Sequence, residues 1–215
     1  SIASRTTPGL IRNCRCTPLH RGASIDVEAI NRPALERLRS RNPRADQVDC
    51  LIVPGFIRPE ALPGLNADFP PIAKGGSYPP EVLRYGPAFA ALIEEIEGDA
   101  MRKAFEAKFA IALDGKPVMI TVRGHTRAKD GRIHTDSKTK LLTALIYFND
   151  EWGAEGGRLR LLRAPGDLED YAAEVPPDKG TLLAFRCTEN AWHGHKPFVG
   201  PRRTILRCLR LTRLV

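Results

Sequence analysis

The hydrophobic period of this chain changes near Gly115, from the spacing of a helix to that of a strand. Before this point, residues 87–110 repeat apolar side chains every three or four positions, and Gly98-Asp99 marks a break between two helices. After it, turn residues separate five short apolar runs, at 118–122, 141–148, 158–162, 181–185 and 204–211. Helices followed by short strands predict an α+β fold, with the helices packed on one sheet of a β-sandwich or barrel.

The N-terminal part of the chain carries weaker patterns. Residues 26–40 place apolar side chains near helical spacing and predict a short helix, and residues 48–53 predict a strand. The stretch 58–86 is rich in proline and glycine, so we expect either a packed irregular connection or a loop over a binding site. We therefore expect a basic arm with a short helix at 1–46 and a single domain at 47–215.

The composition is typical of a globular protein, with 42% hydrophobic and 27% charged residues. No apolar run approaches the roughly 20 residues that cross a bilayer, and no secretory signal is visible, so we expect no membrane segment. The five cysteines are odd in number and scattered, which favours a reducing, cytoplasmic location over a disulfide framework. Cys14-Arg15-Cys16 lacks a second cysteine pair, and free thiols in a loop are the favoured interpretation.

The formal net charge is +8, and the basic residues gather in two places. One is the segment up to Arg44, and the other is the C-terminal tail from Lys196, which contains no acidic residue. Such a balance can indicate a nucleic acid or another acidic partner. The favoured interpretation is a solvated surface together with a site built for anions.

A histidine and an aspartate stand close together after the period changes. His134 and Asp136 are two residues apart, so in a strand both side chains reach the same face. His193 and His195, also two apart, are the candidates for a third ligand from a second strand. Two imidazoles and one carboxylate form the ligand set of non-haem Fe(II) oxygenases. The same spacing also arises by chance, and a structural histidine bonded to Asp136 is the alternative.

The predicted strand at 141–148 has two different faces. Thr143 and Tyr147 share one face with Leu141 and Leu145, so that face carries two hydroxyl groups. The other face is wholly apolar and consists of Leu142, Ala144, Ile146 and Phe148. A face with two hydroxyl groups suits the lining of a polar pocket inside a core, and a half-exposed strand is the alternative.

Four segments of the C-terminal half together resemble a known family: GRIHTDSKTKLLTALIYFNDEW, GGRLRLL, PPDKGTLLAF and WHGHKPFVGPRRTIL. They are similar to the 2-oxoglutarate- and Fe(II)-dependent dioxygenases, in particular to the prolyl-hydroxylase-like branch. The resemblance covers roughly residues 117–212, with an echo at 48–62, and residues 1–46 match nothing. It implies a double-stranded β-helix core, a jelly-roll or cupin-like fold, with N-terminal helices packed on one sheet.

The resemblance assigns roles to individual residues. His134, Asp136 and His193 match the three iron ligands and would form the catalytic centre. His193 is preferred over His195 because Arg202 follows it by nine residues, as in the family's pattern. Arg202 then matches the residue that pairs with the 5-carboxylate of 2-oxoglutarate through two charge-assisted hydrogen bonds.

Further candidates for the co-substrate site follow from the same comparison. Tyr147 matches a tyrosine that bonds the 5-carboxylate, and Thr143 joins it as the second hydroxyl of that strand. Arg203 is the alternative to Arg202 as the partner of the 5-carboxylate, since only one of two successive strand residues points inward. Arg123 stands where the family often has a tyrosine, and it would meet 2-oxoglutarate, an acidic group of the substrate or a surface acid.

The activity that the resemblance implies is hydroxylation of an unactivated C–H bond, coupled to the decarboxylation of 2-oxoglutarate to succinate. Fe(II), 2-oxoglutarate and O2 would be required, with ascorbate as an optional reductant, and the substrate would be a small molecule, a peptide or a protein. One alternative is a nucleic-acid demethylating dioxygenase, whose second arginine follows the first by six residues, as Arg213 follows Arg207. The other is a non-catalytic metal-binding barrel module. A homodimer is compatible with the sequence.

Overall fold

The computed structural model describes residues 29–34 and 49–211 of the chain. Its helices lie together before the main run of strands, as the change of period predicts. They are α2 (Leu62–Asp68), the 3-10 turn η1 (Pro80–Val82), α3 (Pro87–Glu97) and α4 (Asp99–Phe109). The strands are β1 (Cys50–Val53), β2 (Val118–Thr126), β3 (Lys140–Tyr147), β4 (Leu159–Leu162), β5 (Tyr171–Val175), β6 (Leu182–Arg186), β7 (His193–Gly194) and β8 (Gly200–Arg210).

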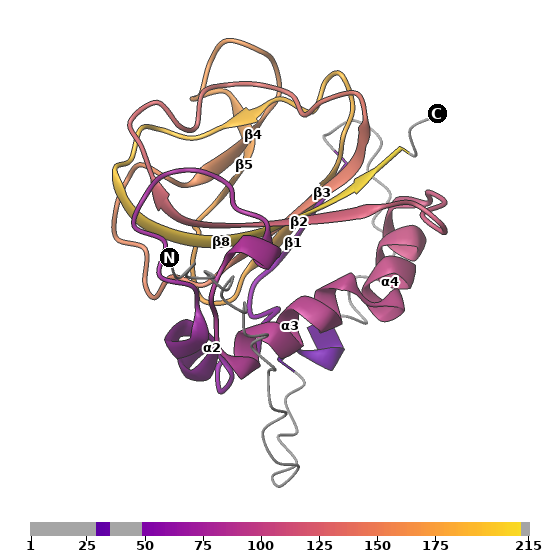
Figure 1. The fold of residues 1–215 in the computed structure, drawn as a ribbon. Coiled ribbons are helices and arrows are strands. Elements are labelled where there is room, and N and C mark those ends of the chain that lie inside the picture. Colours follow the sequence, from indigo (N-terminus) through magenta and orange to yellow (C-terminus); the bar gives the residue numbers. More distant parts are fainter. Residues whose placement is uncertain (1–28, 35–48, 212–215) are drawn as a thin grey trace, which may run out of the picture.

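The strands form two antiparallel sheets. The larger sheet has the order β1-β6-β3-β8-β2, and the smaller one has the order β5-β4-β7. The helices cover one face of the larger sheet, and the smaller sheet lies over its other face (Figure 1). The predicted combination of helices and antiparallel strands is therefore confirmed. β5 was not expected from the sequence, whereas β7 is the second strand from which His193 was expected to come.

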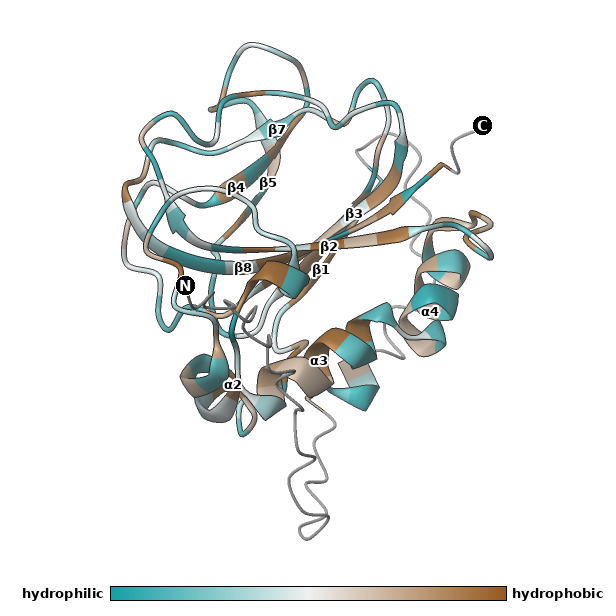
Figure 2. Ribbon diagram, viewed as in Figure 1, coloured by the Kyte–Doolittle hydropathy of each residue, from teal (hydrophilic) through white to brown (hydrophobic). Residues whose placement is uncertain are grey.

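The apolar side chains that repeat along α3 and α4 pack into the core between these helices and the larger sheet. Pro87 starts α3 in its first turn, where a missing N–H is tolerated, and the chain changes direction at Gly98 before α4 begins. This confirms the expected break. Ala110, with a φ of 49°, ends α4 in the left-handed conformation. Figure 2 shows hydrophobic residues on the side of α3 that faces the sheet.

The two faces of β3 separate two cores. Its even-numbered apolar residues pack against the helices, as the alternation predicts; they are Leu142, Ala144, Ile146 and Phe148. Leu145 and Tyr147 face the smaller sheet instead, in a second core with residues of β4, β5 and β6. Leu141 differs from the expectation, because a register shift between Lys140 and Leu142 turns it to the helix side. The same shift leaves Lys140 on the face of Thr143.

The proline- and glycine-rich stretch is an irregular connection with the short elements α2 and η1, and it covers the edge of the larger sheet. Tyr78 and Val122 exchange two backbone hydrogen bonds, of 3.0 and 2.8 Å, at the otherwise open side of β2. Further along β2, a Cβ on Gly124 would lie 2.6 Å from atoms of Ile72, so the stretch approaches the strand as closely as only glycine permits.

The described residues before β1 pack onto the helix side. Ala29 and Ala34 are fully buried, and the Ala29 amide donates to a carboxylate oxygen of Glu95 at 2.9 Å. The helix predicted at 26–40 is only partly visible: residues 32–34 are helical, Ile30 forms a bridge with Ile57, and the remainder lies outside the described residues. The domain boundary after residue 46 stays a prediction.

Among the described residues, no helix is long and apolar enough to cross a membrane. The described cysteines, Cys50, Cys187 and Cys208, are free thiols. Cys14 and Cys16 lie outside the described residues.

Candidate functional site

Two histidines from distant parts of the chain are joined through their backbones. His134 donates its amide to the His193 carbonyl at 3.0 Å, and His193 returns the bond at 2.9 Å. Their rings lie 4.3 Å apart between centroids. We expected His134 and Asp136 in a regular strand, and this is wrong. His134 forms an isolated bridge in the connection from β2 to β3, and its partner belongs to the two-residue strand β7.

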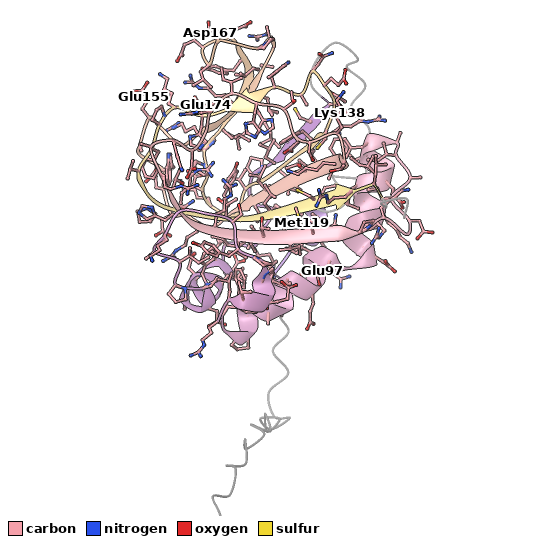
Figure 3. All side chains as sticks on the ribbon, turned by 45° about the horizontal axis from the view of Figure 1, so that its top comes forward. Glu97, Met119, Lys138, Glu155, Asp167 and Glu174 are labelled. Carbon is pink, nitrogen blue, oxygen red and sulfur yellow. The ribbon has the colours of Figure 1, made fainter. Side chains whose placement is uncertain are left out.

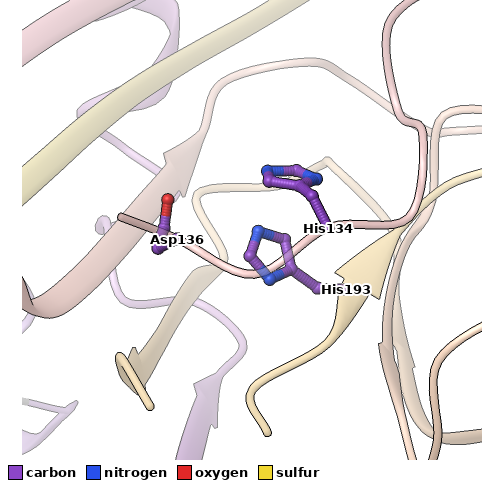
Figure 4. Close-up of side chains that lie close together, drawn as sticks. All are labelled: His134, Asp136 and His193. Atoms are coloured by element: carbon purple, nitrogen blue, oxygen red, sulfur yellow. The ribbon is translucent and has the colours of Figure 1, made fainter. Parts of the chain in front are cut away.

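Asp136 completes a cluster with these two histidines. The side chains of His134, Asp136 and His193 each offer one ligand atom, and these atoms all lie within 4.8 Å of one another (Figure 4). His195 is not in the cluster. Its Nδ1 lies 2.8 Å from the carbonyl oxygen of Lys196, although its ring lines the same cavity.

Each member of the cluster is oriented by a neighbouring group. Nδ1 of His134 lies 2.8 Å from the carbonyl of Arg132, and Nδ1 of His193 lies 2.9 Å from that of Ala191. A carbonyl only accepts, so Nδ1 carries a proton in both rings, and Nε2 is the nitrogen that a neutral ring would offer to a metal. Such outer contacts fix the ring orientation at metal sites.

The carboxylate of Asp136 is held from two sides. Lys140 donates from Nζ to one oxygen at 2.5 Å, and the Thr143 hydroxyl donates to the other at 2.6 Å. Burial acts to raise the pKa of Asp136, but these two bonds outweigh it and the pKa is lowered. Burial lowers the pKa of His193. At neutral pH the aspartate is therefore ionised and His193 is neutral, which are the protonation states that a metal ion requires.

The cluster lies at the wall of a cavity of about 250 Å³. Of the other candidates, Thr143, Arg123 and Arg202 line it. Thr143 differs from the expectation in one respect, because its hydroxyl is engaged with Asp136 and so positions a member of the cluster. Apolar residues of both sheets form another part of the wall, among them Leu145, Leu159, Phe185 and Leu206.

Arg202 and Tyr147 form a buried pair beside this cavity. The guanidinium carbon of Arg202 lies 5.2 Å from the centre of the Tyr147 ring, and its Nε donates to the Gly157 carbonyl at 2.8 Å. Burial raises the pKa of Tyr147 and lowers that of Arg202. Nη2 of Arg202 and the hydroxyl of Tyr147 are buried and have no hydrogen-bond partner in the described part of the chain.

Arg202 points inward and Arg203 points outward. The Arg203 side chain is exposed, and it donates to Asn66 of α2 at 3.2 Å. Arg207 is buried on the helix side, with its guanidinium carbon 5.4 Å from the centre of the Phe105 ring. It therefore faces away from the cavity, and Arg213 lies outside the described residues. The arginine spacing of six, which would suit a demethylating enzyme, does not place Arg207 at this site.

Sequence reasoning assigned no role to three residues of this region. Lys140 reaches the site face only because of the irregularity that follows it in β3. Thr121 and Thr204, on β2 and β8, each bury a hydroxyl that has no partner among the described residues. Both follow from the strand alternation, since Thr204 lies opposite both Tyr147 and Arg123 in the register. The sequence carried no signal for Lys140.

A segment within the C-terminal half of the chain matches a family model. Residues 122–209 match the 2OG-Fe(II) oxygenase superfamily. A comparison with curated protein sequences gives no match.

Solved structures share the fold at low sequence identity. A Pseudomonas putida prolyl-4-hydroxylase aligns with a TM-score of 0.55 and 16% identity, over 84% of this chain and 94% of its own. A collagen prolyl hydroxylase of Paramecium Bursaria Chlorella virus-1, solved with 2OG, aligns with a TM-score of 0.55 and 16% identity, over 76% of this chain and 96% of its own. HygX from Streptomyces hygroscopicus, solved with nickel and 2-oxoglutarate, aligns with a TM-score of 0.53 and 15% identity, over 86% of this chain and 88% of its own. The resemblance inferred from the sequence is therefore confirmed: residues 122–209 match the 2OG-Fe(II) oxygenase superfamily, and the structural neighbours include prolyl hydroxylases.

Proposed function

We propose that this protein is an Fe(II)- and 2-oxoglutarate-dependent oxygenase that hydroxylates an unactivated C–H bond. One observation carries the proposal. A cluster of two imidazoles and one carboxylate shares a cavity with a buried arginine whose Nη2 has no partner. Two antiparallel sheets that face each other are consistent with a double-stranded β-helix around this cavity.

The residues of the cluster fit an iron ion. His134 and His193 would each provide Nε2, and Asp136 would provide a carboxylate oxygen. These donors match the two-histidine, one-carboxylate set of the non-haem Fe(II) oxygenases, and they would leave positions on the metal for the co-substrate and dioxygen. Lys140 and Thr143 would keep the aspartate in place while the metal binds.

The unpaired polar atoms fit the carboxylate of a co-substrate. A buried donor without a partner costs about 1–3 kcal/mol, so native proteins rarely keep one that no ligand satisfies. Arg202 and Tyr147 present two such donors next to each other, and Thr121 and Thr204 add hydroxyl groups on the same face. A 5-carboxylate of 2-oxoglutarate would accept hydrogen bonds from this group, and the Arg202 charge would balance its charge.

When bound, iron and 2-oxoglutarate supply the oxidation, in which R–H, O2 and 2-oxoglutarate give R–OH, succinate and CO2. The chain's own residues bind, orient and exclude water. The apolar wall made by Leu145, Leu159 and Phe185 limits the access of water to the reacting atoms. Two of the structural neighbours are named prolyl hydroxylases, and this favours hydroxylation of a small molecule, a peptide or a protein as the reaction.

The proposal is tested by succinate formation without an added substrate. We expect the whole chain, given Fe(II), ascorbate and 2-oxoglutarate, to form succinate slowly. His134→Ala and Asp136→Ala should abolish this turnover, and His125→Ala is the matched control, because His125 lines a different cavity. Metal binding with no turnover would favour a non-catalytic barrel, and full activity in either cluster variant would overturn the proposal.

A further inference from the structure

The cavity at the cluster has an excess of positive charge. Among its described lining residues there are three permanent cations, Arg123, Lys140 and Arg202, and a single carboxylate, Asp136. Lys140 is paired with that carboxylate at 2.5 Å. Arg202 is buried beside Tyr147, where the proposed function assigns it to the co-substrate. Arg123 is left without an assigned anion.

Arg123 is held in place by a neutral partner. It lies on the site face of β2, opposite Thr204, and the strand bulges immediately after it. Its Nε donates to the Ser77 hydroxyl at 2.7 Å. The backbone bridge between Tyr78 and Val122 keeps Ser77 next to the strand. With Nε engaged, the two Nη groups form the free end of the guanidinium, which is the fork that binds an oxyanion through two parallel bonds.

The acid on the turn that follows β2 is already engaged by another arginine. Asp130 accepts from the Arg127 amide at 2.8 Å and from Nη2 of Arg127 at 2.9 Å. Arg123 forms no ion pair with any acid in the described part of the chain. The expected alternative of a surface ion pair is therefore absent from that part, and Arg123 remains available to a ligand.

The position and size of the cavity limit what that ligand can be. The Arg123 side chain is exposed, so it lies where a ligand entering from solvent meets the site. A cation at such an entrance attracts anions and repels cations. The volume of about 250 Å³ is below the range of about 300–1,000 Å³ that is typical of small-molecule pockets. Iron and 2-oxoglutarate would take up part of it, which leaves room only for a small group.

We propose that the substrate is a small acid whose carboxylate or phosphate group pairs with Arg123. This inference rests on the proposed function of the site. The oxyanion accepts two hydrogen bonds from the Nη groups, and Ser77 holds the guanidinium in the orientation that permits them. Arg123 thereby positions the substrate relative to His134, Asp136 and His193, and it selects acids over neutral and cationic molecules.

The test uses the whole chain with Fe(II), ascorbate and 2-oxoglutarate, and it follows succinate. A small-metabolite extract is divided by anion exchange into an anionic fraction and a fraction of neutral and cationic molecules. We expect the anionic fraction alone to raise succinate formation above the substrate-free rate. Phosphatase treatment of this fraction then distinguishes a carboxylate substrate from a phosphate substrate. If the treated fraction still stimulates succinate formation, the substrate carries a carboxylate, and if the stimulation is lost, it carries a phosphate.

Variants connect this selectivity to Arg123. Arg123→Gln should raise the half-saturating amount of the anionic fraction by about tenfold or more, the effect of losing a charge-assisted pair. Arg123→Lys keeps the positive charge and should recover part of the lost affinity for the anionic fraction. Arg84→Gln is the matched control, because Arg84 is an exposed arginine that does not line the cavity. Ser77→Ala should weaken the response less than Arg123→Gln, because the charge remains.

Several outcomes overturn the inference. They are stimulation by the neutral and cationic fraction, no stimulation by either fraction, and an unchanged response in Arg123→Gln. A larger loss of 2-oxoglutarate affinity in Arg123→Gln than in Arg202→Gln would assign Arg123 to the co-substrate and overturn it as well. Failure of the proposed function is distinguishable, because the wild-type chain would then form no succinate even before a fraction is added.

Discussion

The main chains of His134 and His193 exchange two hydrogen bonds, of 3.0 and 2.9 Å. Backbone pairing, and not a contact between side chains, therefore brings the two imidazoles together. His193 is also paired with Leu161 of β4, so the smaller sheet determines where the second histidine lies. The geometry of the cluster therefore depends on the stability of the smaller sheet.

Arg160 should stabilise the smaller sheet. Its side chain is only 6% exposed, it donates to Glu174 at 2.6 Å and to Glu169 at 2.8 Å, and its residue pairs with Gly194 next to His193. Figure 3 shows Glu155, Asp167 and Glu174 around this sheet, far from Glu97 on the helix side. We expect Arg160→Met to lower the free energy of unfolding at pH 7 by about 1–3 kcal/mol. Arg163→Met, which breaks an exposed pair, is the control.

This contribution should depend on pH. Hydrogen bonds from Arg160 and Lys196 lower the pKa of Glu169. A lowered pKa in the folded state means that the stabilisation is present above about pH 4.3, the ordinary glutamate value, and is lost as the pH falls through the folded pKa. Urea denaturation of the wild type and of Arg160→Met should therefore differ less at pH 3 than at pH 7. An equal difference at both pH values would contradict the ion-pair explanation.

Thr143 should affect metal binding through Asp136. Its hydroxyl donates to the aspartate at 2.6 Å, and Thr143→Val removes this bond with little change of shape. Loss of such an outer contact typically lowers metal affinity by about 10- to 100-fold. Titration with Mn(II) as a redox-stable substitute for Fe(II) measures the effect. Thr143→Ser keeps the hydroxyl and should bind metal nearly as the wild type does, and equal affinities for Thr143→Val and the wild type would refute this role.

Tyr147→Phe should have opposite effects on stability and on co-substrate binding. The Tyr147 hydroxyl is buried without a partner in the described part of the chain, so its removal relieves a cost of about 1–3 kcal/mol in the free protein. The variant should therefore be at least as stable as the wild type to thermal unfolding. It should bind 2-oxoglutarate about tenfold less tightly, because the donor to the carboxylate is gone. A large loss of stability would show that the hydroxyl already has a partner.

The two neighbouring arginines should differ in their effect on 2-oxoglutarate. Arg202 is buried at the cavity, and Arg203 is exposed and bonded to Asn66. Arg202→Met should weaken 2-oxoglutarate binding by about 10- to 100-fold, as expected for a lost charged hydrogen bond. Arg203→Met should change it little. Calorimetric titration of both variants compares them, and the reverse order would mean that β8 presents the other face to the co-substrate.

Local patterns were sufficient where an element is long enough to repeat. The two helices with a break at Gly98 and the opposite faces of β3 follow from spacing alone, because 87–110 and 141–148 each cover several repeats. The same alternation predicts that Arg202 and Arg203 face opposite sides. β7 has two residues and cannot show a period, so its bounds and its partner strand were not predictable from the pattern. Lys140 was missed because one irregularity in β3 reverses which residues face the site.

The sequence by itself determined the residue types of the cluster, the spacing of Arg202 from His193 and the polar face of β3. Only the tertiary structure decided that His193 and not His195 joins His134 and Asp136, that Lys140 pairs with Asp136, and that Arg123 has no acidic partner in the described part of the chain. The physical reason is the range of the interactions. Side-chain direction depends on a residue's own backbone and its neighbours, whereas a meeting of β7 with the segment around His134 depends on pairing between strands that lie far apart in the chain.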